Sequence, residues 1–227
     1  MIASPPRIVA LVPMRDYSER VRGKNYRPLA GWPLFHHILL ALQACPELAD
    51  IVVDTDSPTI KQGLAEHFPR VLILDRPESL RSGEVPMNAI LLHDTELVPA
   101  DFYLQTHSTN PLLRPQTISA AILAFIANLA TRDSLFGVTE LRTRLYDQDG
   151  RSLNHDPREL LRTQDLAPVY EENSCLYIFT RENLLKYGHR IGQAPLMFPV
   201  PRDEALDIDE ELDFQIADFL MRQRPAV

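Results

Sequence analysis

The chain has 227 residues, of which 45% are hydrophobic and 24% are charged, and its 23 basic side chains against 31 acidic ones give a formal net charge of −8. This length and composition predict a single folded domain over residues 1–227 and exclude an intrinsically disordered chain. The acidic balance and the lack of a long apolar run argue against nucleic-acid and membrane partners. Two cysteines without a CxxC spacing, and an N-terminus without a basic leader, favour a cytoplasmic protein.

Short apolar segments alternate with helical patterns along the first part of the chain. Strands are predicted over 8–14, 50–54, 71–74, 101–105 and 134–139. Helices are predicted over 34–42, from 58 onward, over 86–97 and over 115–129. This alternation is typical of an α/β fold in which a mostly parallel sheet carries helices on both faces.

Residues 141–172 interrupt the alternation. They are polar, and turn signals occur at 147–150 and 154–157. A connection of this length inside a compact domain usually serves as a lid or as a contact between subunits. The regular pattern then returns with a strand over 174–179, a short helix over 182–187 and a closing helix over 210–221.

A cluster of basic residues follows the first predicted strand. Between Met14 and Pro28, five cations face two acids inside a chain that is acidic overall. Ligands of open α/β sheets lie outside the carboxyl ends of the strands, where arginine and lysine can hold phosphates. Neither the Walker A pattern nor the dinucleotide glycine pattern is present, so phosphate would be held by side chains. A solvated charged turn is the alternative reading.

A pair of aspartates lies near the C-terminal end of the chain. On an extended segment Asp207 and Asp209 project to the same side. Two carboxylates in this arrangement can hold a hard cation such as Mg²⁺, while the alternative is an acidic cluster that stabilises the start of the last helix. The neighbouring phosphate loop favours the metal.

Five segments in the same order resemble the acylneuraminate cytidylyltransferase family, whose members join CTP to sialic acids and related 2-keto-3-deoxy sugar acids. These segments are RDYSERVRGKN at 15–25, NYRPLAG at 25–31, LQTHSTNPLLR at 104–114, ENSCLYI at 172–178 and LDIDEELD at 206–213. The resemblance implies a nucleotide-diphospho-sugar transferase-like fold, Mg²⁺ as cofactor, and a homodimer in which 141–172 form the dimerisation arm. It also implies formation of a CMP-sugar with release of pyrophosphate.

The resemblance further implies a role for individual residues. The residues expected to contact the nucleotide are Arg15, Ser18, Lys24, Asn25 and Arg76. The residues expected to contact the sugar acid are Gln105, Arg162, Gln164, Asn173 and Tyr177. Asp207 and Asp209 would hold the metal, and the catalytic group would comprise Arg15, Lys24 and Asp209.

Departures from the family pattern keep alternatives open. Glu19 stands where the family usually has lysine, which leaves a catalytically weak nucleotide-binding relative as one alternative. The loop also satisfies the pattern of the 3-deoxy-manno-octulosonate cytidylyltransferases, although Thr106-His107 after Gln105 favours the sialic-type branch. A nucleotidyltransferase for ordinary sugar phosphates is opposed by the absence of a G-x-G-T loop. The sequence leaves open which sugar acid is used and which group is the general base.

Overall fold

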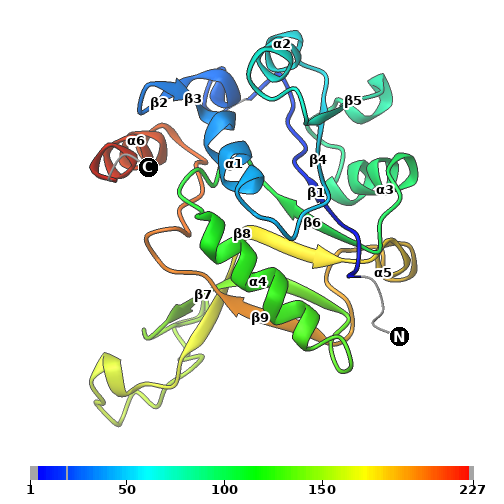
Figure 1. Cartoon of the computed structure of the whole chain (residues 1–227). Coiled ribbons are helices and arrows are strands. Elements are labelled where there is room, and N and C mark those ends of the chain that lie inside the picture. The colour runs from blue at the N-terminus through cyan, green and yellow to red at the C-terminus, as the bar shows by residue number, and fades with distance from the viewer. Residues whose placement is uncertain (1–4, 19, 225–227) are drawn as a thin grey trace.

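The computed structural model describes residues 5–18 and 20–224, and in this part of the chain a seven-stranded sheet forms the centre of the molecule (Figure 1). The strands follow the order β5-β4-β1-β6-β8-β7-β9 across the sheet. Their bounds are β1 Ile8–Leu11, β4 Asp50–Thr55, β5 Leu72–Asp75, β6 Phe102–Thr106, β7 Ser134–Leu141, β8 Val169–Phe179 and β9 Pro195–Pro199.

The sheet is mostly parallel, as the alternation predicts. Strands β5, β4, β1 and β6 pair in parallel, and β7 pairs in parallel with β9. The exception is β8, which runs antiparallel to both β6 and β7. After β1 the chain builds outward to β4 and β5 and then returns to place β6 on the other side of β1. Ligands of such sheets bind at the carboxyl ends where the strand order reverses, which here means between β1 and β6.

Helices cover both faces of the sheet, which confirms the predicted layers. Side chains of β1 alternate, with Ile8, Ala10 and Val12 in one apolar cluster and Val9 and Leu11 in the other. The first cluster receives α1 (Leu34–Gln43), α2 (Pro58–His67) and α4 (Pro115–Ala127). The second receives α3 (Met87–Leu97) and α5 (Arg181–Tyr187). No helix in the described part of the chain is long and apolar enough to cross a bilayer.

A small hairpin and the last helix form a separate packing unit beside the sheet. Strands β2 (Pro28–Leu29) and β3 (Trp32–Pro33) pair with each other, and α6 (Glu211–Gln223) lies next to them (Figure 1). Leu29, Leu34 and Phe214 are among the buried residues of this unit. Neither the hairpin nor β9 is predicted from the sequence, because their strands are short and contain prolines, which suit only the edges of sheets.

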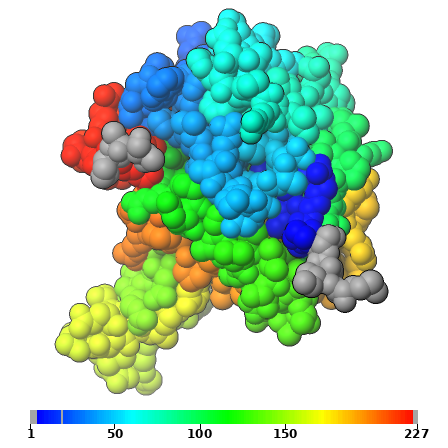
Figure 2. Space-filling model, in the orientation of Figure 1, coloured from blue at the N-terminus to red at the C-terminus, as the bar shows by residue number. Residues whose placement is uncertain are grey.

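The segment that the sequence sets apart projects from the body of the molecule (Figure 2). Its boundaries differ from 141–172, since Leu141 still belongs to β7 and β8 already begins at Val169. We call residues 142–168 the arm. It contains a short 3₁₀ helix, Thr163–Asp165, and two further such turns lie elsewhere at Lys24–Tyr26 and Glu78–Leu80. The arm is therefore a continuation of two sheet strands rather than a loop laid on the surface.

Candidate functional site

A cavity of about 370 Å³ opens at the carboxyl ends of β1, β5 and β6. All of the residues expected to contact the nucleotide line it, namely Arg15, Ser18, Lys24, Asn25 and Arg76. Residues 107–109, which follow β6, line the same cavity, as do Ser82 and Gly83. The basic loop and the strand-ending segments thus meet at the edge of the sheet where an open α/β fold binds its ligand.

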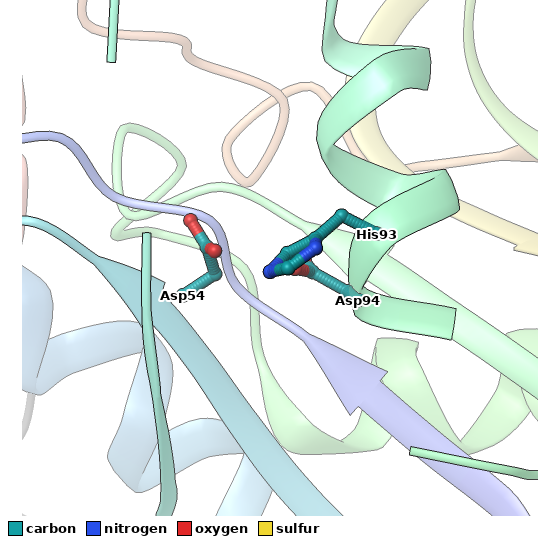
Figure 3. A group of neighbouring side chains, drawn as sticks. All are labelled: Asp54, His93 and Asp94. Carbon is teal, nitrogen blue, oxygen red and sulfur yellow. The ribbon is translucent and has the colours of Figure 1, made fainter. Parts of the chain in front are cut away.

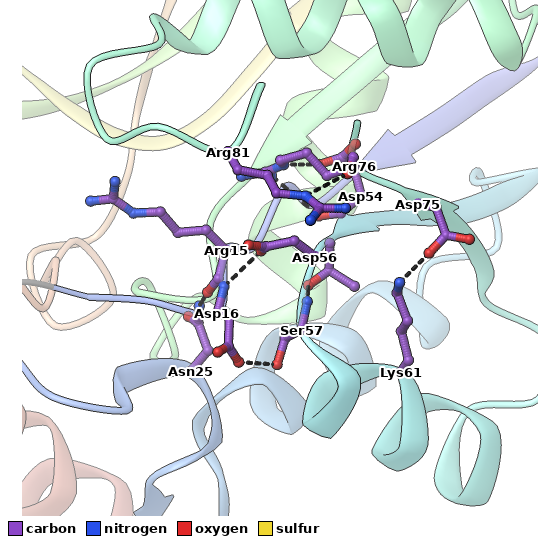
Figure 4. Close-up of polar contacts among 11 residues, drawn as sticks. Arg15, Asp16, Asn25, Asp54, Asp56, Ser57, Lys61, Asp75, Arg76 and Arg81 are labelled. Carbon is purple, nitrogen blue, oxygen red and sulfur yellow. Dashed lines mark hydrogen bonds and ion pairs between the residues drawn. The ribbon is translucent and has the colours of Figure 1, made fainter. Parts of the chain in front are cut away.

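The start of the basic loop is anchored to the segment after β4 (Figure 4). The backbone N–H of Asp16 donates to Asp56 Oδ1 at 2.9 Å, and the hydroxyl of Ser57 donates to the Asp16 carboxylate. Met14 also forms a parallel bridge with Thr55. These contacts hold the backbone that carries Arg15 at the end of β1, where its guanidinium faces the cavity.

The buried side chain of Asn25 holds the second half of the same loop through two hydrogen bonds. Its Nδ2 donates to the backbone oxygen of Arg15 at 2.8 Å, and its Oδ1 accepts from the Ser108 hydroxyl at 2.6 Å. Gly23 makes the preceding turn with φ at 63°, a conformation that favours glycine. The Asn25 side chain therefore ties the loop to the residues after β6, so that it shapes the cavity that it lines.

Arg76 is held against the floor of the cavity by a buried acid. Its Nε donates to Asp54 Oδ1, and both side chains are almost fully buried, at 3% and 0% exposure. A second buried carboxyl, that of Asp94, faces Asp54 from α3 (Figure 3). Burial and repulsion by Asp54 raise the pKa of Asp94 to about 8. Asp94 is therefore protonated at neutral pH, and one negative charge balances the one guanidinium.

His93 lies beside these two acids. Its Nε2, like Asp54 Oδ2 and both Asp94 carboxyl oxygens, is buried without a hydrogen-bond partner in the described part of the chain. The ligand-type atoms of the three side chains lie within 4.8 Å of one another. Because the Arg76 guanidinium already occupies Asp54, a proton shared between the acids suits this cluster better than a metal ion.

Lys24 lies between the nucleotide cavity and the aspartate pair. Its Nζ donates to the backbone oxygen of Ile208 at 2.5 Å. Burial lowers the pKa of Lys24, and the charges of Asp207 and Asp209 oppose this shift. Lys24 thus presents its positive charge where the phosphates and the two carboxylates would meet.

Asp207 and Asp209 flank Ile208, whose side chain is buried. Burial raises the pKa of Asp207, with the charge of Asp209 adding to the shift. Asp207 Oδ1 is buried without a hydrogen-bond partner among the described residues, and Asp209 forms an ion pair with Arg20 at 2.7 Å. Oxygen donors of this kind fit a hard cation such as Mg²⁺.

Gln105 and Tyr177 occupy neighbouring positions of paired strands, β6 and β8. Gln105 Nε2 lies 2.8 Å from His107 Nε2. Desolvation lowers the pKa of His107 to about 3, with Arg190 and Lys24 adding to the shift, so the imidazole is neutral and accepts this hydrogen bond. The Tyr177 hydroxyl donates to the Glu172 carboxylate. The residues expected on the acceptor side therefore adjoin the nucleotide cavity through His107.

Asn173 has a structural position in this chain. Its Nδ2 donates to Thr139 Oγ1 and its Oδ1 accepts from the backbone of Cys175, both at 3.2 Å. Ser174 adopts φ of 56°, and the pairing of β7 with β8 shifts register close by. Asn173 therefore satisfies the hydrogen bonds of a β-bulge, and its contact with the sugar acid stays a prediction.

Arg162 and Gln164 lie in the arm, and the cavity of their own chain does not include them. The Arg162 guanidinium pairs with Asp165 at 2.6 Å, and the Gln164 backbone oxygen accepts from Arg142. Their predicted contact with the sugar acid would require a second copy of the chain. Glu19, the loop position that departs from the family pattern, lies outside the described residues.

Sequence reasoning missed Asp54, Asp94 and Arg190. Asp54 is the last residue but one of the buried strand β4, and Asp94 interrupts the apolar face of a helix. An acid within such an apolar pattern is the signal that could have singled them out. Arg190 follows a short helix in a segment without any motif. Only its contacts with Gln105 and Tyr177 reveal it.

A cation-lined cavity at the edge of a mixed α/β sheet where the strand order reverses defines a phosphate- or nucleotide-binding α/β protein. The model of the family described as "Cytidylyltransferase" matches residues 9–224, so the chain belongs to the cytidylyltransferase family. It is 25% identical to the "Post-translational flagellin modification protein B" of Campylobacter coli over 96% of each chain. It is 27% identical to the "CMP-N,N'-diacetyllegionaminic acid synthase" of Legionella pneumophila over 95% of this chain and 96% of the relative.

Solved structures show the same fold. The CMP:2-keto-3-deoxy-manno-octonic acid synthetase complexed with CTP superposes with a TM-score of 0.70 over 96% of this chain and 99% of that chain, at 17% identity. The 4-diphosphocytidyl-2C-methyl-D-erythritol synthase of Anaerococcus prevotii superposes with a TM-score of 0.68 over 96% and 97% of the two chains, at 12% identity. These likenesses confirm the predicted nucleotide-diphospho-sugar transferase-like fold.

Proposed function

We propose that this cytidylyltransferase transfers CMP from CTP to a 2-keto-3-deoxy sugar acid of the sialic or nonulosonate type and releases pyrophosphate. The observation that carries the proposal is that the five residues expected to contact the nucleotide line one cavity, in a chain that belongs to the cytidylyltransferase family. The similarity to a CMP-diacetyllegionaminic acid synthase supports a sugar acid as the acceptor.

In this reaction the anomeric hydroxyl of the sugar acid attacks the α-phosphorus of CTP. A new oxygen–phosphorus bond forms as the hydroxyl gives its proton to a carboxylate or to solvent, the bond between the α-phosphorus and the bridging oxygen breaks, and the electron pair of that bond leaves with pyrophosphate. Arg15 and Lys24 line the cavity from the loop after β1, where they would neutralise the phosphate oxygens of the leaving group. The buried Arg76 approaches the same cavity from the end of β5, and its ion pair with Asp54 holds it in place for the nucleotide.

Asp207 and Asp209 would hold Mg²⁺, which supplies additional positive charge to the phosphates when it is bound. The support for this assignment is the unpartnered Asp207 Oδ1 and the position of Asp209 next to it. Lys24 donates to the backbone between the two aspartates, so it orients the carboxylates relative to the nucleotide cavity.

The arm would act as a dimer contact. It projects from the body, and four of its leucines are exposed, with Leu145 at 37%, Leu153 at 64%, Leu160 at 90% and Leu161 at 40%. Exposed leucines on a projecting segment are typical of a surface that another chain covers. In a dimer formed through the arms, the partner's Arg162 and Gln164 would approach the pocket of the first chain. The Arg162 and Gln164 of the first chain do not line that pocket.

The decisive test is pyrophosphate release from CTP and Mg²⁺ with a panel of sialic acid, legionaminic acid and 3-deoxy-manno-octulosonate, and with UTP in place of CTP. We expect activity with CTP and at least one of these acids. The Asp209→Asn variant should lose at least about 100-fold in turnover, on the scale of a lost electrostatic contact in the transition state. Asp203→Asn is the matched control, because among the described residues this exposed acid forms an ion pair with Arg114 alone, at the surface. CTP binding without turnover on any member of the panel would instead identify a nucleotide-binding relative.

A further inference from the structure

A second cavity, of about 360 Å³, adjoins the nucleotide cavity. It is lined by Met87, Asn88, Glu172, His189, Arg190 and Ile191, and Met87 lines both cavities. Most of these side chains are polar or charged. Because Met87 lines both cavities, the second cavity offers space for an acceptor beside a nucleotide bound in the first.

Arg190 connects this cavity to the two residues expected to touch the sugar. Its guanidinium carbon lies 3.6 Å from the centre of the Tyr177 ring, and its Nη1 donates to Gln105 Oε1 at 2.8 Å. The stacking fixes the plane of the guanidinium, and the hydrogen bond fixes its rotation. Such a preorganised guanidinium loses little conformational entropy when it binds a further group.

The remaining donors of Arg190 have no protein partner in the described part of the chain. No carboxylate lies within ion-pair distance of Arg190 there, although Glu172 lines the same cavity and is held by the Tyr177 hydroxyl. Arg162, by contrast, is paired with Asp165 in the arm at 2.6 Å. Among the described residues that line the second cavity, Arg190 therefore supplies a guanidinium with free donors, and its charge favours an oxygen-bearing, anionic ligand.

We propose that Arg190 is an acceptor-binding residue whose guanidinium donates to an oxygen atom of the sugar acid beside Gln105 and Tyr177. The proposal rests on the proposed function, since it assigns a residue to the acceptor of that reaction. The oxygen belongs either to the carboxylate or to a hydroxyl of the sugar, and both present the same hydrogen-bond acceptor to the guanidinium.

The test compares Arg190→Met with Arg190→Lys and with the wild type, using the sugar acid that the wild type converts best. Methionine keeps an unbranched, apolar stem without the guanidinium group and its charge. We expect R190M to raise the KM for the sugar acid by about 10- to 100-fold, the scale of a hydrogen bond to a charged group, and R190K to give a smaller rise. The dissociation constant for CTP, measured by calorimetry, should stay within about twofold. Lys186→Met, which removes an exposed cation from the preceding helix, serves as the matched control.

A role limited to folding would predict a different result. In that case R190M would lower the melting temperature and weaken CTP binding together with sugar binding, or it would leave the KM for the sugar acid unchanged. Either result overturns the proposal. Because the comparison uses an acceptor that the wild type converts, failure of the proposed function appears separately, as a wild type that converts no member of the panel.

The C1 methyl ester of the same sugar identifies the oxygen. If Arg190 binds the carboxylate, the ester should inhibit wild type and R190M equally. The wild type alone should then bind the acid more tightly than the ester. If Arg190 binds a hydroxyl, the wild type should bind acid and ester more tightly than R190M by the same factor. Equal affinity of wild type and R190M for both compounds contradicts a contact with either group.

Discussion

The floor of the nucleotide cavity depends on the balance of charge among three side chains. Arg76 pairs with Asp54 in a position where both are almost fully buried, and Asp94 stands next to Asp54 without any partner in the described residues. A buried guanidinium with one carboxylate is neutral, and a second ionised carboxylate would leave an uncompensated charge. The proton on Asp94 therefore keeps Arg76 available to the nucleotide.

Asp94→Asn is expected to change how stability depends on pH. The pKa of Asp94 is raised to about 8 by burial and by Asp54, so the folded chain retains a proton that the unfolded chain releases near pH 4. Between about pH 4 and about pH 8 the folded state binds more protons, and wild-type stability falls as the pH rises through this window. The side chain introduced in D94N cannot ionise, so this loss of stability is absent from the variant. Relative to the wild type, the free energy of unfolding of D94N should therefore be higher at about pH 8 than at about pH 5.

Urea unfolding at these two pH values, with Asp203→Asn as the control, measures the effect. A stability difference between D94N and the wild type that is the same at both values would show that Asp94 is already ionised in the folded protein.

Arg15→Ala is expected to weaken CTP binding. The guanidinium of Arg15 lines the nucleotide cavity and makes no ion pair with a described residue. Its removal should cost about 1–3 kcal/mol of CTP binding free energy, the scale of a hydrogen bond to a charged group. Isothermal calorimetry with CTP gives the value. Arg158→Ala, which removes an exposed arginine of the arm, is the control. Equal CTP affinities of the two variants would show that Arg15 does not contact the nucleotide.

At the scale of elements, α6 supports the aspartate segment that precedes it. Asp213 Oδ2 accepts from the backbone N–H groups of Asp209 at 3.0 Å and Glu210 at 2.7 Å, as part of a capping box. Arg27 forms a bidentate pair with Glu211 at 2.6 and 2.7 Å and lies over the Phe214 ring. The start of α6 thereby connects the basic loop to the candidate metal-binding residues.

Asp213→Ala tests this support. Loss of the cap should lower the free energy of unfolding by about 1 kcal/mol, the usual cost of removing a helix N-terminal cap. Because Asp209 loses its backbone anchor, we also expect the concentration of Mg²⁺ needed for half-maximal activity to rise. Asp218→Ala, farther along the same helix, is the control for helix stability. An unchanged requirement for Mg²⁺ in D213A would show that the cap of α6 does not support metal binding by Asp209.

The elements show which patterns carry information in the sequence. The strands β1, β4, β5 and β6 and the helices between them follow from short apolar runs and helical spacing, and all are confirmed. The hairpin β2–β3 and the edge strand β9 do not, because two-residue strands and a proline at each end of β9 leave no periodicity. The polar composition of the arm identifies it in the sequence. The same polarity conceals the apolar alternation that would predict the strand segments leading into and out of it.

At the scale of the whole molecule, the arm makes a prediction about assembly. If the arm of one copy completes the pocket of another, a chain with a defective pocket and a chain with a defective arm should rescue each other. We expect Lys24→Met and Arg162→Met to be nearly inactive alone. Co-expressed in equal amounts, they should give about a quarter of wild-type activity, because half of the dimers are mixed and each holds one complete site.

Separately purified and unmixed variants provide the baseline, and sedimentation of each variant controls for assembly. Mixed dimers no more active than the sum of the two parents would show that each chain completes its own pocket.

The sequence by itself determined the layered α/β fold, the basic loop after the first strand, the aspartate pair and the family, because periodicity, spacing and motifs are local properties of the chain. Only the tertiary structure decided which distant side chains meet. Arg190 reaches Gln105 across 85 positions of the sequence, and Asp94 on helix α3 reaches the Arg76–Asp54 pair at the ends of two strands. Such contacts depend on the order of the strands, which reverses between β1 and β6 and gathers at one edge of the sheet residues that the chain keeps far apart.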